Sequence, residues 1–231
     1  MCALPRSFLT PEEYLAMERQ AETKSEYLSG EGFSMAGASF AHNMIASNTL
    51  VSLVPQLKRR SCTAHSSDLR VNVRATNFYA YPDIVVVCGQ PQFEDRHRDT
   101  LLNPTAIFEI LSCSTEGYDR GEKFANYRML ESLADYILVS QYRALVEHFT
   151  RQPDESWLLK TYAGLEAVLS ISSIGCELPL ADIYDQVAWP EEEVRITGIR
   201  LVRDESGHYE YEYEFEGGLY ADRPDPPGLY R

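Results

Sequence analysis

The chain has 231 residues, with 21 lysines and arginines against 35 aspartates and glutamates, and its formal net charge is −14. Because 44% of the residues are hydrophobic, the chain can bury a core, which excludes a disordered or fibrous protein and predicts a globular one. The negative charge argues against a protein that coats nucleic acid nonspecifically, since phosphate binding needs a concentrated positive surface.

The compartment is predicted from apolar segments and from the cysteines. No segment approaches the roughly 18 apolar residues of a membrane-spanning helix, and the N-terminal segment lacks the apolar stretch of a secretion signal. We therefore expect a cytoplasmic protein without membrane contact. The five cysteines are an odd number at spacings that fit neither a disulfide framework nor a zinc site. We expect them to be reduced thiols, buried or inert.

The first predicted element is a short helix in TPEEYLAMERQ (10–20), where a threonine cap precedes two early glutamates. The segment SEYLSGEGFSMAG (25–37) predicts a strand, a turn and a second strand. Apolar residues at helical intervals predict a core-facing helix over 40–58. Short strands are then expected at 68–73, 84–88 and 106–112.

A helix at about 120–131 is expected next, followed by strands at 136–139, 146–150 and 157–162. Helices that flank a block of apolar strands are typical of an α/β or α+β domain with one mixed central sheet. We assign this domain to residues 1–189.

Residues 190–231 form a separate acidic extension, which begins with a run of three glutamates. The segments VRITGIRLVRD and HYEYEYEFEG alternate polar with apolar or aromatic residues around ESG, which predicts a β-hairpin with one wet face. The last segment, RPDPPGLYR, is so rich in proline that we expect only an extended tail.

Two acidic residues stand out beside apolar strands in the middle of the chain. In YAYPDIVVVC, Asp83 follows Pro82 and marks the entry to a buried strand. In NPTAIFEILS, Glu109 lies inside an otherwise apolar strand. A buried carboxylate is costly unless it is protonated, paired or bound to a metal, so Glu109 needs a compensating partner.

Asp83 is the candidate neighbour of Glu109. If their strands lie side by side, joined by the polar loop 89–103, the two carboxylates converge with no cation in either strand. Like charges at close range call for a cation, and oxygen ligands favour Mg²⁺ or Mn²⁺ over zinc. The alternative for Asp83 is a structural role, because a strand-initial aspartate is often an edge or turn residue.

A positive group is available in STEGYDRGEKFANYRML (114–130). Lys123 would lie on the first turn of the expected helix, where a positive side chain is mildly unfavourable, and it shares a face with apolar residues four and seven positions later. The amine should therefore border the buried side, with a solvated lysine as the alternative. Asp119 and Glu122 have the spacing of a capping box for the same helix, which favours a structural role for that pair.

Five segments, read in order, carry a resemblance to a known family: KSEYLSGE, GASFAHN, YPDIVVVCG, NPTAIFEILSCST and YDRGEKFANYRMLESLADYILVSQ. Together they resemble the Uma family of endonucleases, which belongs to the PD-(D/E)XK restriction-endonuclease-like superfamily. The resemblance covers about residues 8–187. It implies a restriction-endonuclease-like core with a mixed central β-sheet flanked by helices.

The resemblance also implies a metal-dependent endonuclease that hydrolyses DNA phosphodiester bonds and leaves 5′-phosphate ends. Asp83 and Glu109 would hold Mg²⁺ or Mn²⁺. The chain departs from the superfamily pattern at Leu111, where a lysine is expected two residues after the acid. The family supplies this lysine from the following helix, which corresponds to Lys123. Its role would be to orient the attacking water or to stabilise charge that builds up on phosphorus.

Three further residues are candidates with open alternatives. Glu26 resembles an early acid of the family and would approach the metal directly or through a neighbour, or else pair with Lys24 or an arginine at the surface. His42 begins the long helix in a shared motif and would contact substrate or hydrogen-bond the site, or else serve as an ordinary helix-start residue. Asp68 would support Lys123, or else cap a strand.

The implied partners are DNA and a divalent metal ion. Dimerisation, frequent in restriction-type folds, would enlarge a small basic surface. The competing hypothesis is a catalytically inactive nuclease-fold module that binds DNA or a protein partner. The overall acidity and Leu111 favour the module, whereas the retained acids and lysine favour the enzyme. The basic residues available for a phosphate backbone are Lys58, Arg59, Arg60, Arg70, Arg74, Arg96 and Arg98.

Overall fold

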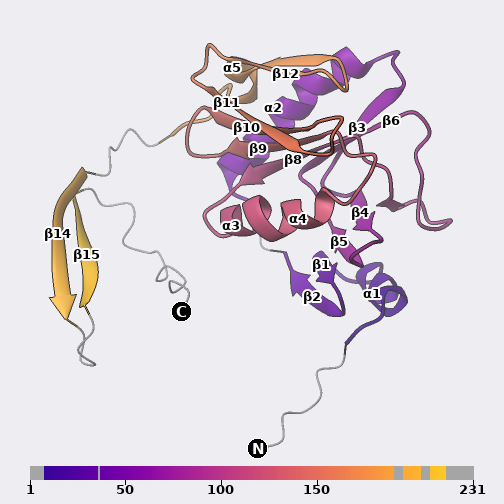
Figure 1. The fold of residues 1–231 in the computed structure, drawn as a ribbon, viewed down its shortest axis with the longest axis horizontal. Helices are drawn as coiled ribbons and strands as arrows, with labels where there is room; N and C mark the ends of the chain where they lie inside the picture. The colour runs from indigo at the N-terminus through magenta and orange to yellow at the C-terminus, as the bar shows by residue number, and fades with distance from the viewer. Residues whose placement is uncertain (1–7, 36, 190–194, 204–208, 217–231) are drawn as a thin grey trace, which may run out of the picture. The chain divides into compact units, whose positions relative to one another are not determined.

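A six-stranded mixed sheet forms the centre of the fold in this computed structural model, which describes residues 8–35, 37–189, 195–203 and 209–216 (Figure 1). The strand order is β11-β10-β9-β8-β6-β3. β8 and β9 are parallel, and every other neighbouring pair in this sheet is antiparallel. The strands are β3 (Cys62–Ser66), β6 (Ile84–Cys88), β8 (Ala106–Leu111), β9 (Asp135–Ser140), β10 (Leu145–Arg151) and β11 (Trp157–Ala163).

The expected mixed central sheet flanked by helices is confirmed, and the remaining strands of the domain form a second sheet and a hairpin that were not predicted. The second sheet has five strands in the order β2-β1-β5-β4-β7. Its strands are β1 (Ser25–Leu28), β2 (Glu31–Ser34), β4 (Arg70–Val73), β5 (Phe78–Ala80) and β7 (Thr100–Leu101). The hairpin consists of β12 (Val168–Ile171) and β13 (Cys176–Pro179).

Helices cover both faces of the six-stranded sheet. Figure 1 shows α2 (Phe40–Leu57) on one side of it, and α3 (Glu116–Tyr118), η1 (Asp119–Lys123) and α4 (Phe124–Tyr127) on the other. The first helix, α1 (Pro11–Glu18), begins at the predicted Thr10 cap, and α5 (Leu180–Ile183) is a short turn. No helix within the described ranges combines the length and the apolar character needed to cross a membrane.

The helix expected at 120–131 differs from the prediction at both ends. It begins at Glu116, passes through one π-helical turn at 119–123, and ends at Tyr127. Asp119 therefore lies inside the helical segment rather than at its start. The predicted capping box of Asp119 and Glu122 is wrong.

The core on the α4 side of the sheet surrounds the strand that carries Glu109. Alternation along β8 places Ile107 and Leu111 on the same face as Glu109, and both pack in the cluster that includes Tyr127 and Tyr136. All six residues of β8 are buried. Glu109 is therefore held inside an apolar layer, as its strand pattern predicts.

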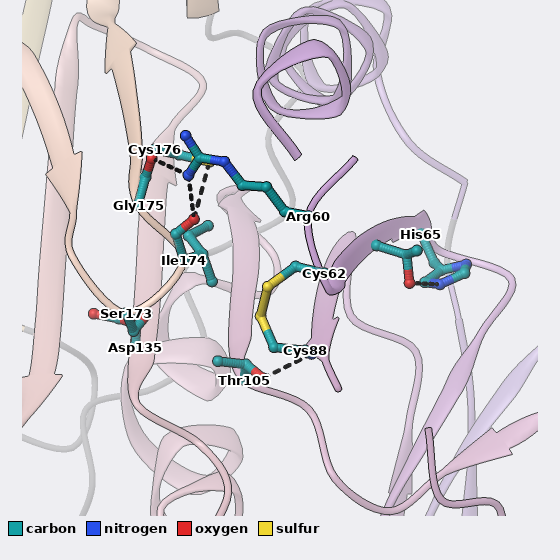
Figure 2. The surroundings of a disulfide bond; sticks show 11 residues. Arg60, Cys62, His65, Cys88, Thr105, Asp135, Ser173, Ile174, Gly175 and Cys176 are labelled. Carbon is teal, nitrogen blue, oxygen red and sulfur yellow. Dashed lines mark hydrogen bonds between the residues drawn. A yellow bond between two sulfur atoms is a disulfide. The ribbon is translucent and has the colours of Figure 1, made fainter. Parts of the chain in front are cut away.

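A disulfide joins Cys62 on the edge strand β3 to Cys88 on β6 (Figure 2). The two residues are directly opposite in the antiparallel register, which brings their side chains together. The expectation of reduced thiols is therefore wrong for this pair. Among the other described cysteines, Cys113 is exposed and Cys176 is buried, and both are free thiols.

The chain divides into two compact units, Met1–Ala188 and Trp189–Arg231. In the second, β14 (Arg195–Arg203) pairs with β15 (Tyr209–Glu216) in antiparallel register, which confirms the predicted hairpin strands. The predicted ESG turn and the proline-rich tail lie outside the described residues.

Candidate active site

Asp83 and Glu109 meet at the start of β6. The two strands pair antiparallel with Ile84 opposite Phe108, so the next position brings Asp83 opposite Glu109, and the adjacency expected from the sequence is confirmed. The backbone N–H of Ile110 donates to Asp83 Oδ2 at 2.7 Å, and the backbone N–H of Asp83 donates to Glu109 Oε2 at 3.4 Å. These contacts fix both carboxylates against the same pair of strands.

Glu109 occupies an environment that disfavours its charge. The residue is only 2% exposed. Burial raises the pKa of Glu109 well above its ordinary value, while the positive charge of Lys123 acts in the opposite direction. A carboxylate in this position is tolerated because a cation lies beside it.

Lys123 supplies that cation from the π-helical turn. Its Nζ lies 3.1 Å from Glu109 Oε1, 3.1 Å from Glu26 Oε1 and 3.3 Å from Asp119 Oδ1. Burial alone lowers the pKa of Lys123, but the negative charges of Glu109 and Glu26 outweigh it and raise the pKa well above the ordinary value. Lys123 therefore remains protonated and serves as a fixed positive charge, not as a base.

Glu26 and Asp119 complete the group of acids around Lys123. Glu26 lies on β1 and is 6% exposed, so the structure places it beside Lys123 rather than in a surface pair with Lys24. Asp119 is buried as well, and sequence reasoning missed it because its local pattern favoured a cap. The spacing of four residues between Asp119 and Lys123 is the signal that could have found it.

His42 contacts the site from the N-terminal end of α2. Its Nε2 lies 3.1 Å from Asp83 Oδ2, and its Nδ1 is buried without a hydrogen-bond partner among the described residues. Ser39 caps the helix by accepting a hydrogen bond from the backbone N–H of His42. The helix start therefore holds the imidazole against the carboxylate.

Two residues considered from the sequence lie elsewhere. The Asp68 side chain is 83% exposed and pairs with Lys24, so its predicted support of Lys123 is wrong. Arg70 is buried and donates hydrogen bonds to Tyr81 and Thr100, which removes it from the residues that could track a phosphate backbone.

The donor set suits a hard divalent cation. Every acidic group gathered here offers carboxylate oxygens, which Mg²⁺ and Mn²⁺ prefer. Oε1 of Glu109 and Oε1 of Glu26 are buried and make no hydrogen bond of good geometry in the described structure, although the Lys123 ammonium lies 3.1 Å from each of them. Among the described residues, no three His, Cys, Asp or Glu side chains are arranged to bind a metal ion. Glu26, Glu109 and Asp119 surround Lys123 instead. Asp83 and Glu109 are the pair that could hold the ion.

Comparison of the sequence with known proteins shows one family and two relatives. The Uma2 family model, described as "Putative restriction endonuclease", matches residues 11–181. The uncharacterized protein sll1609 of Synechocystis sp. is 36% identical over 74% of this chain and 97% of its own length. The uncharacterized protein slr1290 of the same organism is 33% identical over 78% of this chain and 94% of its own length.

A solved structure shares the fold. It is a crystal structure from Anabaena variabilis whose title describes "a putative nuclease belonging to DUF820". The TM-score is 0.65 at 18% sequence identity, and the match covers 78% of this chain and 99% of that chain. The mixed sheet flanked by helices is thus an architecture that this nuclease-like neighbour also has.

Proposed function

This chain belongs to the Uma2 family of restriction-endonuclease-like proteins, and from that premise we propose that it is a metal-dependent endonuclease that hydrolyses DNA phosphodiester bonds. One observation carries the proposal. Asp83, Glu109 and Lys123 come from separate parts of the sequence, yet Glu109 contacts both the Asp83 backbone and the Lys123 amine.

Asp83 and Glu109 would hold the metal ion. Bound there, Mg²⁺ or Mn²⁺ would neutralise charge at the scissile phosphate and make an attacking water more acidic. The backbone N–H of Ile110 and the imidazole of His42 both contact Asp83 Oδ2, and they fix the orientation of this carboxylate. The buried layer around Glu109 limits water, which strengthens electrostatic interactions within the site.

Lys123 stabilises negative charge that develops on the phosphoryl oxygens. It suits this role because its ammonium is held in place by three carboxylates and stays protonated. Glu26 and Asp119 act as positioning residues for that ammonium. The lysine comes from a helix in this chain, and the position two residues after Glu109 is filled by the buried Leu111.

The test is cleavage by the purified full chain of plasmid and labelled oligonucleotide DNA in Mg²⁺, Mn²⁺ or EDTA. We expect cleavage with either metal and none in EDTA. Asp83→Asn, Glu109→Gln and Lys123→Met should each lower the rate by at least about a hundredfold. Asp68→Asn is the matched control, because that acid is exposed and lies outside the site.

Metal binding has a readout that does not depend on activity. Mg²⁺ should raise the thermal unfolding temperature of the wild type and have little effect on Asp83→Asn. Failure to cut any DNA substrate with either metal would refute the nuclease. DNA binding without cleavage and without metal dependence would favour an inactive binding module instead.

A further inference from the structure

Four aromatic side chains are exposed among the described residues: Phe8, Phe33, Phe40 and Tyr142. Three of them are connected to the candidate active site: Phe33 by strand register, Tyr142 by hydrogen bonds, and Phe40 by its place in the helical turn that carries His42. We call Phe33, Phe40 and Tyr142 the aromatic rim.

Phe40 is the most exposed of the three, at 79%. It is the first residue of α2 and lies two positions before His42, whose imidazole contacts Asp83. Because the ring covers no core and lies at the helix end that faces the site, packing does not account for its presence. The ring is therefore free to contact a molecule bound beside the first turn of α2.

Tyr142 is held next to the same helix end by a chain of hydrogen bonds. The Ser39 hydroxyl donates to Gln141 Oε1 at 2.8 Å, and Gln141 Nε2 donates to the Tyr142 hydroxyl at 2.6 Å. The backbone N–H of Cys113, four residues after Glu109, donates to the same hydroxyl at 2.8 Å. The hydroxyl is thus anchored just beyond the ends of β8 and β9, while the side chain stays 42% exposed.

Phe33 borders the site from the second sheet. It is directly opposite Glu26 in the antiparallel pair of β1 and β2, and opposite residues point to the same face. Glu26 contacts Lys123, whereas Phe33 on the edge strand remains 48% exposed. The three rings therefore come from the second sheet, the first turn of α2 and the loop that follows β9.

Positive charge near the rim is scarce. Arg143, beside Tyr142, is exposed and makes no ion pair within the described part of the chain. Lys123 is enclosed by acids, and Arg120 is paired with Glu116 and Glu147. The protein has a net charge of −14 and few unpaired cations near the rim, so electrostatic attraction to phosphates is weak. The binding free energy must therefore come largely from other contacts.

We propose that the aromatic rim stacks unpaired bases on either side of the scissile phosphate, so that the substrate is single-stranded or locally unpaired DNA. Aromatic side chains stack on the faces of bases in single strands, and a nearby arginine follows the backbone. Within an intact duplex those faces are covered by neighbouring base pairs. The inference rests on the proposed function, because it assumes that the phosphate lies at Asp83 and Glu109.

The first experiment measures binding of the wild-type chain in EDTA, so that cleavage plays no part. Fluorescence anisotropy compares a labelled single strand with the blunt duplex of the same sequence. We expect the single strand to bind at least about tenfold more tightly, and Phe40→Ala and Tyr142→Ala each to weaken that binding about tenfold. A fluorescent base analogue in the strand should be quenched by the wild type and less by these variants.

The controls separate stacking from folding. Tyr142→Phe keeps the ring and should bind single strands nearly as the wild type does, whereas Tyr142→Ala should not. Phe8→Ala removes an exposed ring outside the rim and should change nothing. Circular dichroism and thermal unfolding check that each variant is folded.

The outcomes distinguish this inference from the proposed function. Equal affinity for single strand and duplex, or unchanged binding in both alanine variants, would refute base stacking by the aromatic rim. This holds even if the wild type cleaves DNA. Conversely, the protein could bind single strands through the rim and yet cleave DNA with neither metal. That result would support base stacking by the rim and refute the proposed nuclease activity. Cleavage of both strand types with rim-dependent preference for single strands would support both.

Discussion

Replacing Lys123 with methionine tests the electrostatic account of the site most directly. Methionine has similar length and fills similar space, so the change removes a charge and leaves little cavity. In the wild type, the Lys123 amine lies 3.1 Å from carboxylate oxygens of both Glu109 and Glu26. A Coulomb estimate at an effective dielectric constant of about 20 gives roughly 5 kcal/mol for each contact.

The net effect on stability is smaller than this gross attraction, because burial of the charges opposes it. Removing one partner of a buried ion pair typically costs about 3–5 kcal/mol. We expect Lys123→Met to lose about that much free energy of unfolding in EDTA at neutral pH, measured by urea denaturation. Added Mg²⁺ should stabilise this variant more than it stabilises the wild type, because the ion replaces the missing positive charge among the same acids.

Two further variants give the comparison its control. Lys24→Met removes a lysine paired with the exposed Asp68, and should cost no more than about 1 kcal/mol. In the double variant Lys123→Met with Glu109→Gln, part of the lost stability should return, since the buried carboxylate is then gone. A loss below about 1 kcal/mol for Lys123→Met would refute the view that this amine balances the buried acids.

Three other predictions concern stability away from the site. The hydrogen bond from Arg19 holds the pKa of Asp99 at about 2, below its ordinary value. The stability that Asp99 contributes is therefore present above about pH 4 and is lost as the pH falls through about 2. Urea stabilities of wild type and Asp99→Asn should differ at about pH 6 and converge near pH 2, and a constant difference would contradict this. Cys62→Ser removes a disulfide to Cys88 that spans 26 residues, and should cost about 3 kcal/mol under oxidising conditions but little in reductant. Asp135→Ala leaves the buried His148 without its acidic partner and should lower the free energy of unfolding by about 3 kcal/mol, measured by thermal or urea unfolding. A change below about 1 kcal/mol would show that Asp135 and His148 are not coupled.

The sequence predicted those parts of the fold and site that depend on regular alternation. The apolar runs around Asp83 and Glu109 indicated two buried strands, and the hypothesis that these strands lie side by side is confirmed by their pairing. Burial of Glu109 followed from the apolar residues on both sides of it. The conclusion that this acid needs a positive partner rested on general energetics, and the structure places Lys123 there.

The remaining features depend on tertiary contacts that local patterns do not encode. Asp119 matched a capping box, but the helix begins three residues earlier and the acid turns toward Lys123. Cys62 lies in a polar edge strand that was not predicted, so its register with Cys88 was unknown. Division of the strands into two sheets likewise depends on how distant segments pair.

The π-helical turn at 119–123 makes the spacing of the chain at this point critical. An α-helix advances about 100° per residue, so inserting or deleting a single residue between Asp119 and Lys123 would rotate the ammonium away from Glu109 while leaving a continuous helix. We expect natural variation in length to fall in the loops of this protein and to spare these five positions.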